Sequence, residues 1–221
     1  MKKIRELPVY KKRALYSLLF PLFIVLVLWV VFLVSSILHL DLSGWGIFPR
    51  RLSGLKGIIF APFIHGSLKH LANNTLPLFL LMAGTIYFYR DLGYKVILYI
   101  WLMGGTWVWI AARPAYHIGA SGIIYGLASF LFFSGILRKH IPLIAISLLV
   151  IFLYGSMIWG VFPLLEEISW ESHFLGGVAG FVLAIIYRKE GPQKPVPFWE
   201  LEEEEDNDEP PAFFSEYNPP D

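Results

Sequence analysis

The chain has 221 residues, of which 56% are hydrophobic and 16% are charged. Because a soluble domain carries roughly 25% charged residues, this composition excludes an ordinary soluble globular protein. The formal net charge of +1 gives no indication of nucleic-acid binding, and the absence of cysteine excludes disulfide and thiolate chemistry.

The charged residues gather toward the two ends of the chain. Residues 1–13 include Lys and Arg at six positions, and residues 191–221 are rich in proline and contain the acidic run Glu202–Asp206. A strongly charged, proline-rich segment buries too little apolar surface to fold. We therefore predict a basic N-terminal tail at 1–13, a membrane domain at 14–190 and a disordered acidic tail at 191–221.

Apolar segments between the tails are long enough to cross a membrane, which takes about 20 residues of helix. Helix is the default in lipid because backbone N–H and C=O groups must be paired within the segment. The first apolar segment is too long for a signal-peptide core and is interpreted as a retained span. We predict an all-α, polytopic membrane protein with six spans, at Leu15–Leu38, His70–Tyr89, Val96–Ala112, Ile118–Leu137, Ile141–Phe162 and His173–Tyr187.

The connection from Asp41 to Lys69 is long for a loop, which predicts a structured segment at the membrane surface. Cytoplasmic loops are enriched in Lys and Arg, so the basic tail favours a cytoplasmic N-terminus. With six spans, both termini are then cytoplasmic, and the starts of the fourth and sixth spans lie toward the external face. The compact six-span core and the absence of eukaryotic targeting features predict a prokaryotic plasma membrane.

Two polar residues stand at the starts of otherwise apolar segments. Ser121 lies in the sequence Gly119-Ala120-Ser121-Gly122, and His173 opens the last predicted span. Ionisable groups at membrane depth are costly and usually functional. A serine hydroxyl becomes nucleophilic when an adjacent base accepts its proton, and His173 is the base available in the last span. The sequence therefore predicts a Ser–His catalytic dyad.

Small residues follow both members of this dyad. Gly122 and Gly126 are four residues apart, and so are Gly176 and Gly180. Two glycines at this spacing form a helix face that lets a neighbouring backbone approach closely. The two faces predict the close helix contact that the dyad requires.

Candidate donors for a tetrahedral intermediate lie in the second predicted span. His70 and Asn74 are at i and i+4 and share one helix face. With the backbone N–H of Ser121, their side chains are candidates for binding the oxyanion. The alternative is that His70 lies at the membrane interface and Asn74 hydrogen-bonds a neighbouring helix.

These motifs resemble those of the rhomboid family of intramembrane serine proteases. The family's Gly-x-Ser-Gly motif is matched by residues 119–122, and its His-x-x-x-Asn motif by His70 and Asn74. The histidine upstream of that second motif is matched by His65. The resemblance implies that the first motif carries the nucleophile and the second the oxyanion donors.

The resemblance extends over Phe60 to Tyr187. The last core helix of the family has a His followed by Gly at +3 and +7, matched by His173, Gly176 and Gly180. The tyrosine that packs against the catalytic histidine in the family is matched by Tyr125. These positions are the expected supporting residues of the site, together with Gly119, Gly122 and His65.

The resemblance also implies an activity: cleavage of transmembrane segments in single-span membrane proteins, within the lipid bilayer and without a metal or cofactor.

One feature departs from the family. The Trp-Arg pair that many members have in the first external loop has no counterpart where Lys56 and Gly57 stand. No buried Asp is evident to orient the histidine as in soluble triads, so we expect helix packing and Tyr125 to position the ring.

Three alternatives remain open from the sequence. His117, four residues before the nucleophile, is a rival base. His65, His70 and His173 are conceivable metal ligands, although no His-Glu-x-x-His motif is present. A non-catalytic rhomboid relative that binds membrane clients without cutting them is the third.

Overall fold

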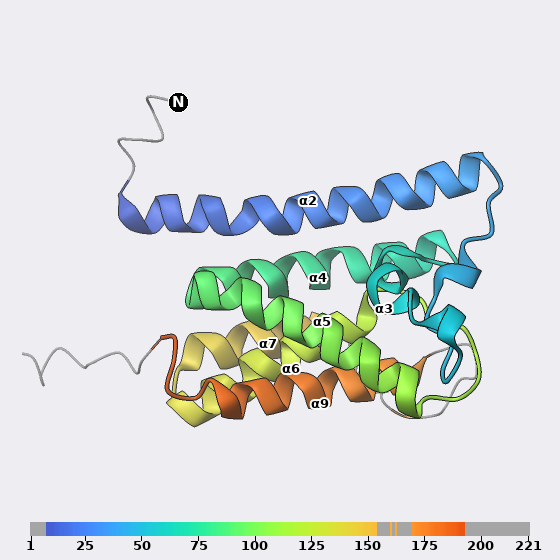
Figure 1. Ribbon diagram of the computed structural model, residues 1–221. Helices are drawn as coiled ribbons and strands as arrows, with labels where there is room; N and C mark the ends of the chain where they lie inside the picture. The colour runs from blue at the N-terminus through green and yellow to red at the C-terminus, as the bar shows by residue number, and fades with distance from the viewer. Residues whose placement is uncertain (1–7, 154–159, 161, 163–168, 193–221) are drawn as a thin grey trace, which may run out of the picture.

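The computed structural model is an α-helical bundle (Figure 1), and it describes residues 8–153, 160, 162 and 169–192. Consecutive long helices run in opposite directions, with α2 on the outside against α4 (Figure 1). No β-strand is found among the described residues, so the predicted all-α class is confirmed. The long helices are α2 (Val9–Ile37), α4 (Leu68–Tyr89), α5 (Asp91–Ala111), α6 (Ser121–Arg138), α7 (Ile141–Leu153) and α9 (Trp170–Ile186).

Four of these helices, α2, α4, α5 and α6, are long and apolar enough to cross a membrane. Helix α9 has 17 residues, and α7 is described over 13 residues. The predicted fifth span and the predicted acidic tail lie partly or largely outside the described residues, so the count of six spans stays a prediction. Helix α2 begins at Val9, before the predicted Leu15, and Arg13 within it donates to the Tyr87 and Phe88 carbonyls at the end of α4.

Helix α6 lies at the centre of the bundle and contacts α4, α5, α7 and α9. Its side chains Leu127, Phe130 and Leu131 are completely buried. Helix α2, in contrast, exposes Phe23, Leu26 and other apolar side chains along its outer face, where lipid would surround it. Burial of α6 therefore fixes Ser121, its first residue, against the other helices.

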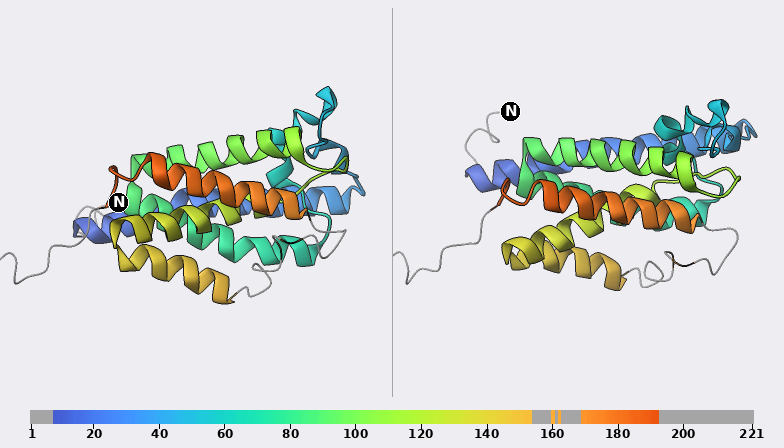
Figure 2. Two further views of the ribbon diagram at one scale, coloured as in Figure 1. Left: turned by 90° about the horizontal axis from the view of Figure 1, so that it is seen from below. Right: turned by 60° about the horizontal axis from the view of Figure 1, so that its bottom comes forward.

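The most extensive contact in the bundle joins α6 to α9, which lie side by side in both views of Figure 2. A Cβ placed on Gly176 would overlap the Gly122 carbonyl, and one on Gly180 would overlap the Gly126 carbonyl. The two helix backbones thus touch through the glycine faces that the sequence predicts. At the far end of the pair, Arg138 donates to carbonyls just after α9, which ties α9 to α6 there.

The loop between α2 and α4 is ordered, as predicted, and is built from short helical turns: η1 (Ser43–Trp45), η2 (Leu52–Gly54), α3 (Gly57–Phe60) and η3 (Ala61–Phe63). The Arg50 guanidinium donates to the carbonyls of Ile110 and Ala112, at 3.2 and 2.9 Å. It thereby satisfies free carbonyls at the C-terminal end of α5 and places a positive charge at the negative end of that helix dipole. In the same loop, Lys56 Nζ lies 4.5 Å from the centroid of the Trp45 ring.

Alternation of helix direction places the start of α6 and the start of α9 at one end of the bundle, beside the ordered loop (Figure 1). The start of α2 and the end of α9 lie at the opposite end (Figure 1). The two predicted catalytic residues are therefore on one side of the bundle, and the two ends of the described chain are on the other. Which side faces the cytoplasm stays a prediction.

The glycine contact between α6 and α9 generates a stability prediction. We expect Gly180→Ala to destabilise the protein by about 1–3 kcal/mol, because its Cβ would overlap a backbone carbonyl that cannot move freely. Gly177→Ala, one turn earlier on the same helix, is the matched control, since its Cβ meets no atom within 4 Å. Alanine favours helix over glycine, so the control should be neutral or slightly stabilising. Thermal unfolding in detergent measures both, and equal midpoints would contradict the packing argument.

Candidate active site

Ser121 is the first residue of α6 and follows the segment 112–120 that connects α5 to α6. Gly119, two residues earlier, has φ +101°, a backbone conformation that residues other than glycine rarely adopt. Its N–H donates to the Ala61 carbonyl at 2.9 Å, which anchors the segment on the ordered loop. A Cβ on Gly119 would lie 2.7 Å from His70 Nε2, so glycine is required here by both conformation and space.

The structure brings the two predicted catalytic residues together. His173 Nε2 lies 2.7 Å from Ser121 Oγ, within hydrogen-bond distance. The imidazole is stacked on the Tyr125 ring with centroids 4.2 Å apart and planes 12° from parallel. Because His173 is 8% exposed, its orientation is fixed by these neighbours and not by water.

A backbone carbonyl holds the other nitrogen of this imidazole. His173 Nδ1 lies 2.7 Å from the Gly160 oxygen. A carbonyl can only accept a hydrogen bond, so the proton is on Nδ1, and Nε2 is left with the lone pair that can accept from the Ser121 hydroxyl. The carbonyl thus does what an Asp does in a soluble triad, which is to select the tautomer and the ring orientation.

Gly160 was missed by sequence reasoning. Every residue carries a carbonyl, so no residue type indicates this role. The glycine itself has a spatial reason: a Cβ would overlap the Tyr125 hydroxyl and lie 2.9 Å from His173 Nδ1. The expectation that packing and Tyr125 alone orient the histidine is therefore incomplete.

The predicted oxyanion donors face the turn before the nucleophile. The Cβ position of Gly119 lies 2.7 Å from His70 Nε2 and 3.6 Å from Asn74 Nδ2, so both side chains line the same small region. The N–H of Ser121 belongs to the first turn of α6, where backbone donors have no partner within the helix and the helix dipole favours negative charge. The side chains of His70 and Asn74 and the backbone N–H of Ser121 therefore lie around the turn at Gly119 that leads into α6.

His65 orients Asn74. The Asn74 amide nitrogen lies 3.0 Å from His65 Nε2, and since the amide donates, that ring nitrogen accepts. Burial, and then the nearby charge of His70, lowers the pKa of His65 to about 4, which keeps its ring neutral at neutral pH. An amide has two N–H groups, so the second remains for a ligand. Ser67 caps α4 by accepting from the His70 N–H at 3.1 Å, which fixes the start of the helix that carries both donors.

The rival base, His117, is placed elsewhere. Its Nδ1 lies 2.5 Å from Ser169 Oγ and its Nε2 lies 3.1 Å from the Arg113 carbonyl, so both ring nitrogens are engaged away from Ser121. The metal alternative also lacks support from the geometry. Both ring nitrogens of His173 are hydrogen-bonded, to Ser121 and Gly160. Within the described ranges, no three His, Cys, Asp or Glu side chains are arranged to hold a metal ion.

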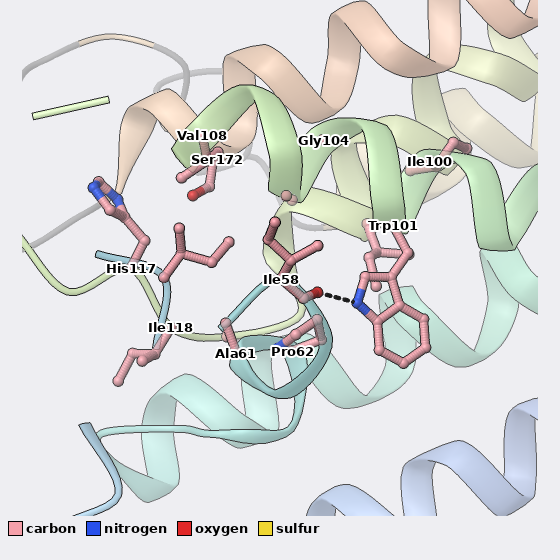
Figure 3. Close-up of a pocket in the computed structure, with 15 residues that line it drawn as sticks. Ile58, Ala61, Pro62, Ile100, Trp101, Gly104, Val108, His117, Ile118 and Ser172 are labelled. Carbon is pink, nitrogen blue, oxygen red and sulfur yellow. Dashed lines mark hydrogen bonds between the residues drawn. The ribbon is translucent and has the colours of Figure 1, made fainter. Parts of the chain in front are cut away.

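A small cavity of about 40 Å³ lies behind the start of α6, between the ordered loop and α5 (Figure 3). Gly119 and Gly122 are among the residues that line it. Ser172 lines it too, as Figure 3 shows. A water molecule needs roughly 10–15 Å³ of such space, so the cavity is large enough for water next to residues that flank Ser121 in the chain. A separate apolar groove of about 550 Å³ runs between α6, α7 and α9. His173 lines it, together with phenylalanines such as Phe132 and Phe174.

Fold and site together define an α-helical membrane protein with a buried serine–histidine pair at one end of its bundle. The model of the Rhomboid domain matches residues 53–190, and the chain belongs to the rhomboid family. An uncharacterized protein of Mycobacterium tuberculosis strain H37Rv is 36% identical over 173 residues, covering 73% of this chain and 71% of its own length. An uncharacterized protein of Mycobacterium leprae is 32% identical over 174 residues, covering 72% and 66%. The chain is thus a rhomboid-family intramembrane protease or a rhomboid-like protein.

The donors around Gly119 generate a kinetic prediction. Removal of one oxyanion donor typically lowers kcat by about 10²-fold, so Asn74→Ala should reduce peptide hydrolysis by this order while the Ser121 N–H and His70 sustain residual activity. Asn73→Ala is the matched control, because that neighbouring asparagine is exposed. Initial rates on a peptide substrate measure both variants. Wild-type rates for Asn74→Ala would remove this residue from the site.

Proposed function

We propose that this protein is an intramembrane serine endopeptidase that cleaves transmembrane segments of single-span membrane proteins. The observation that carries the proposal is the relay from the Gly160 carbonyl through His173 to Ser121, with 2.7 Å at each hydrogen bond. A histidine in the wrong tautomer could not accept the serine proton. The hydrogen bond to the Gly160 carbonyl keeps the proton on Nδ1, so Nε2 is free to accept the proton of a nucleophilic serine.

In the proposed reaction Ser121 Oγ attacks the scissile carbonyl while His173 Nε2 takes the hydroxyl proton. The resulting imidazolium keeps its Nδ1–H on the Gly160 oxygen and lies against the Tyr125 face, where a cation is favoured by the ring. The oxyanion is bound by the Ser121 N–H with His70 and Asn74. His173 then returns its proton to the leaving amine, and an acyl-enzyme ester on Ser121 remains.

Water completes the reaction. His173, neutral again, takes a proton from a water molecule as that water attacks the ester carbonyl. Collapse of the second tetrahedral intermediate releases the carboxylic acid and returns the proton to Ser121. The cavity lined by Gly119 and Gly122 has space for such water close to the site.

The second candidate function is that of a non-catalytic relative that binds membrane clients. Family membership alone is compatible with it. The hydrogen-bonded Ser121–His173 pair favours the enzyme, because a binding protein has no need of a serine aligned on a buried imidazole. We further propose an external active site and cytoplasmic termini on the basis of the basic N-terminal tail. A prokaryotic plasma membrane is the proposed location, supported by the compact helical core and the mycobacterial relatives.

A serine-directed fluorophosphonate tests the proposed function. We expect covalent labelling at Ser121 in the wild-type protein, insensitive to chelators, and its loss in both Ser121→Ala and His173→Ala. Peptide cleavage should fall to background in each variant, and the double variant should be no worse than either, because the two groups act as one unit. Thermal unfolding confirms that the variants are folded. Retained cleavage in folded Ser121→Ala would overturn the proposal.

Substrate choice should depend on local weakness of the client helix. A transmembrane helix hides its carbonyls in backbone hydrogen bonds, and unwinding in lipid exposes polar groups at high cost. Glycine or proline near the scissile bond lowers that cost. For a single-span model substrate with a small residue before the cut, we expect replacement of the downstream helix breakers by leucine to slow cleavage at least about tenfold, or some 1.4 kcal/mol. An unchanged rate would show that unwinding does not limit cleavage.

A further inference from the structure

The dyad has a second hydrogen bond beside it that joins the same two segments. His117 precedes Ser121 by four residues, and Ser169 precedes His173 by four residues. His117 Nδ1 and Ser169 Oγ are 2.5 Å apart. A second His–Ser pair thus joins the two segments, four residues before the Ser121–His173 pair in each. The order of the partners is reversed, with the histidine on the α6 side and the serine on the α9 side.

The direction of this second bond follows from its surroundings. His117 Nε2 faces the Arg113 carbonyl at 3.1 Å and must donate to it, so Nδ1 is an acceptor and the Ser169 hydroxyl donates. The Ser169 oxygen in turn lies 2.6 Å from the Ser172 hydroxyl, which can donate to it. Burial lowers the pKa of His117, and this favours the neutral ring that the arrangement requires.

Ser169 does not use its hydroxyl as an ordinary helix cap. It occupies the N-cap position of α9, where a serine side chain normally accepts from a backbone N–H in the first turn. No such side-chain bond is formed here. The hydroxyl is instead directed across to the segment before α6, so the start of α9 is attached to another part of the chain.

The attachment point on that segment is rigid. His117 is 2% exposed, and its backbone exchanges two hydrogen bonds with Ile47 of the ordered loop, at 2.9 and 3.0 Å. A second, longer contact joins the same segment to the start of α9. In it, Arg113 Nε lies 3.5 Å from the carboxylate of the buried Glu171. The start of α9 is therefore held against a part of the molecule that also positions the nucleophile.

We propose that His117 and Ser169 are positioning residues that set the distance between Ser121 and His173, and this rests on the proposed function. On one side of the dyad, the glycine faces fix α6 against α9. These glycine contacts and the Arg138 bonds all lie on the side of the dyad toward the far end of the two helices, so by themselves they leave the starts of α6 and α9 free to shift relative to each other. The His117–Ser169 bond fixes the pair on the other side, so the serine and histidine are held from both sides.

The expected consequence is a loss of turnover and not of binding. A misplacement of about 1 Å between reacting groups can cost about 10²-fold in rate, and loss of one hydrogen bond should produce part of that effect. We expect Ser169→Ala to lower kcat about tenfold, with KM changed less than about twofold, and to lower the rate of fluorophosphonate labelling in parallel. Ser169→Thr keeps the hydroxyl and should restore most of the rate.

Ser147→Ala is the matched control for the chemical change. Ser147 is a completely buried serine on α7 whose hydroxyl donates to the Leu143 carbonyl at 2.8 Å, outside both segments that carry the dyad. Its removal should leave kcat and the labelling rate within about twofold of wild type. An equal loss of turnover in Ser147→Ala and Ser169→Ala would overturn the inference, since it would indicate general destabilisation.

The histidine side of the bond provides an independent test. His117→Asn offers an amide oxygen near the position of Nδ1 and should be more active than His117→Ala, while the double variant of Ser169→Ala and His117→Ala should be no slower than His117→Ala alone. Additive losses or the absence of rescue by asparagine would overturn the inference. A wild-type protein that neither labels nor cleaves would refute the proposed function, whereas an active wild type with an equally active Ser169→Ala would refute only the positioning role.

Discussion

The backbones of α6 and α9 touch, and the rest of the site depends on this contact. The Ser121 side chain is short, so its hydroxyl meets the His173 ring only when the two helices are closely packed. Gly176 against Gly122 and Gly180 against Gly126 make the approach possible. In lipid no hydrophobic driving force brings helices together, so close van der Waals contact and buried hydrogen bonds supply much of the association.

Three buried histidines at the site end have defined hydrogen-bond partners, and Nε2 of His173 is left to face the Ser121 hydroxyl. The partner of His173 is the Gly160 carbonyl, that of His65 is Asn74, and those of His117 are Arg113 and Ser169. A backbone carbonyl as the partner of His173 avoids placing a carboxylate at membrane depth, where charge is costly. A neutral group thus orients the imidazole, and no buried charge is needed for that purpose.

The ordered loop between α2 and α4 joins these parts. It accepts the N–H of Gly119 on Ala61, pairs Ile47 with His117, and contributes Arg50 to the end of α5. These contacts fix the segment that leads into Ser121, which would otherwise be a connection without regular structure. One basic residue of this loop, Arg50, therefore has a structural role, since it caps the C-terminal end of a helix.

Much of the architecture could be predicted from the sequence because it depends on local properties. Apolar length and the pairing of backbone groups in lipid predict the helices, and most predicted boundaries lie within a few residues of those observed. The spacing of Gly122 with Gly126 and of Gly176 with Gly180 indicates the contact faces, and the residue types of Ser121 and His173 indicate the dyad.

The sequence could not decide which hydrogen-bond partners some groups have. These groups either occur in every residue or belong to a residue type that serves several roles. The Gly160 carbonyl is chemically like every other carbonyl, and Ser169 looks like an ordinary helix cap. Only the tertiary structure decides these roles, because a hydrogen-bond partner is chosen by which segments fold against each other and not by the residue alone.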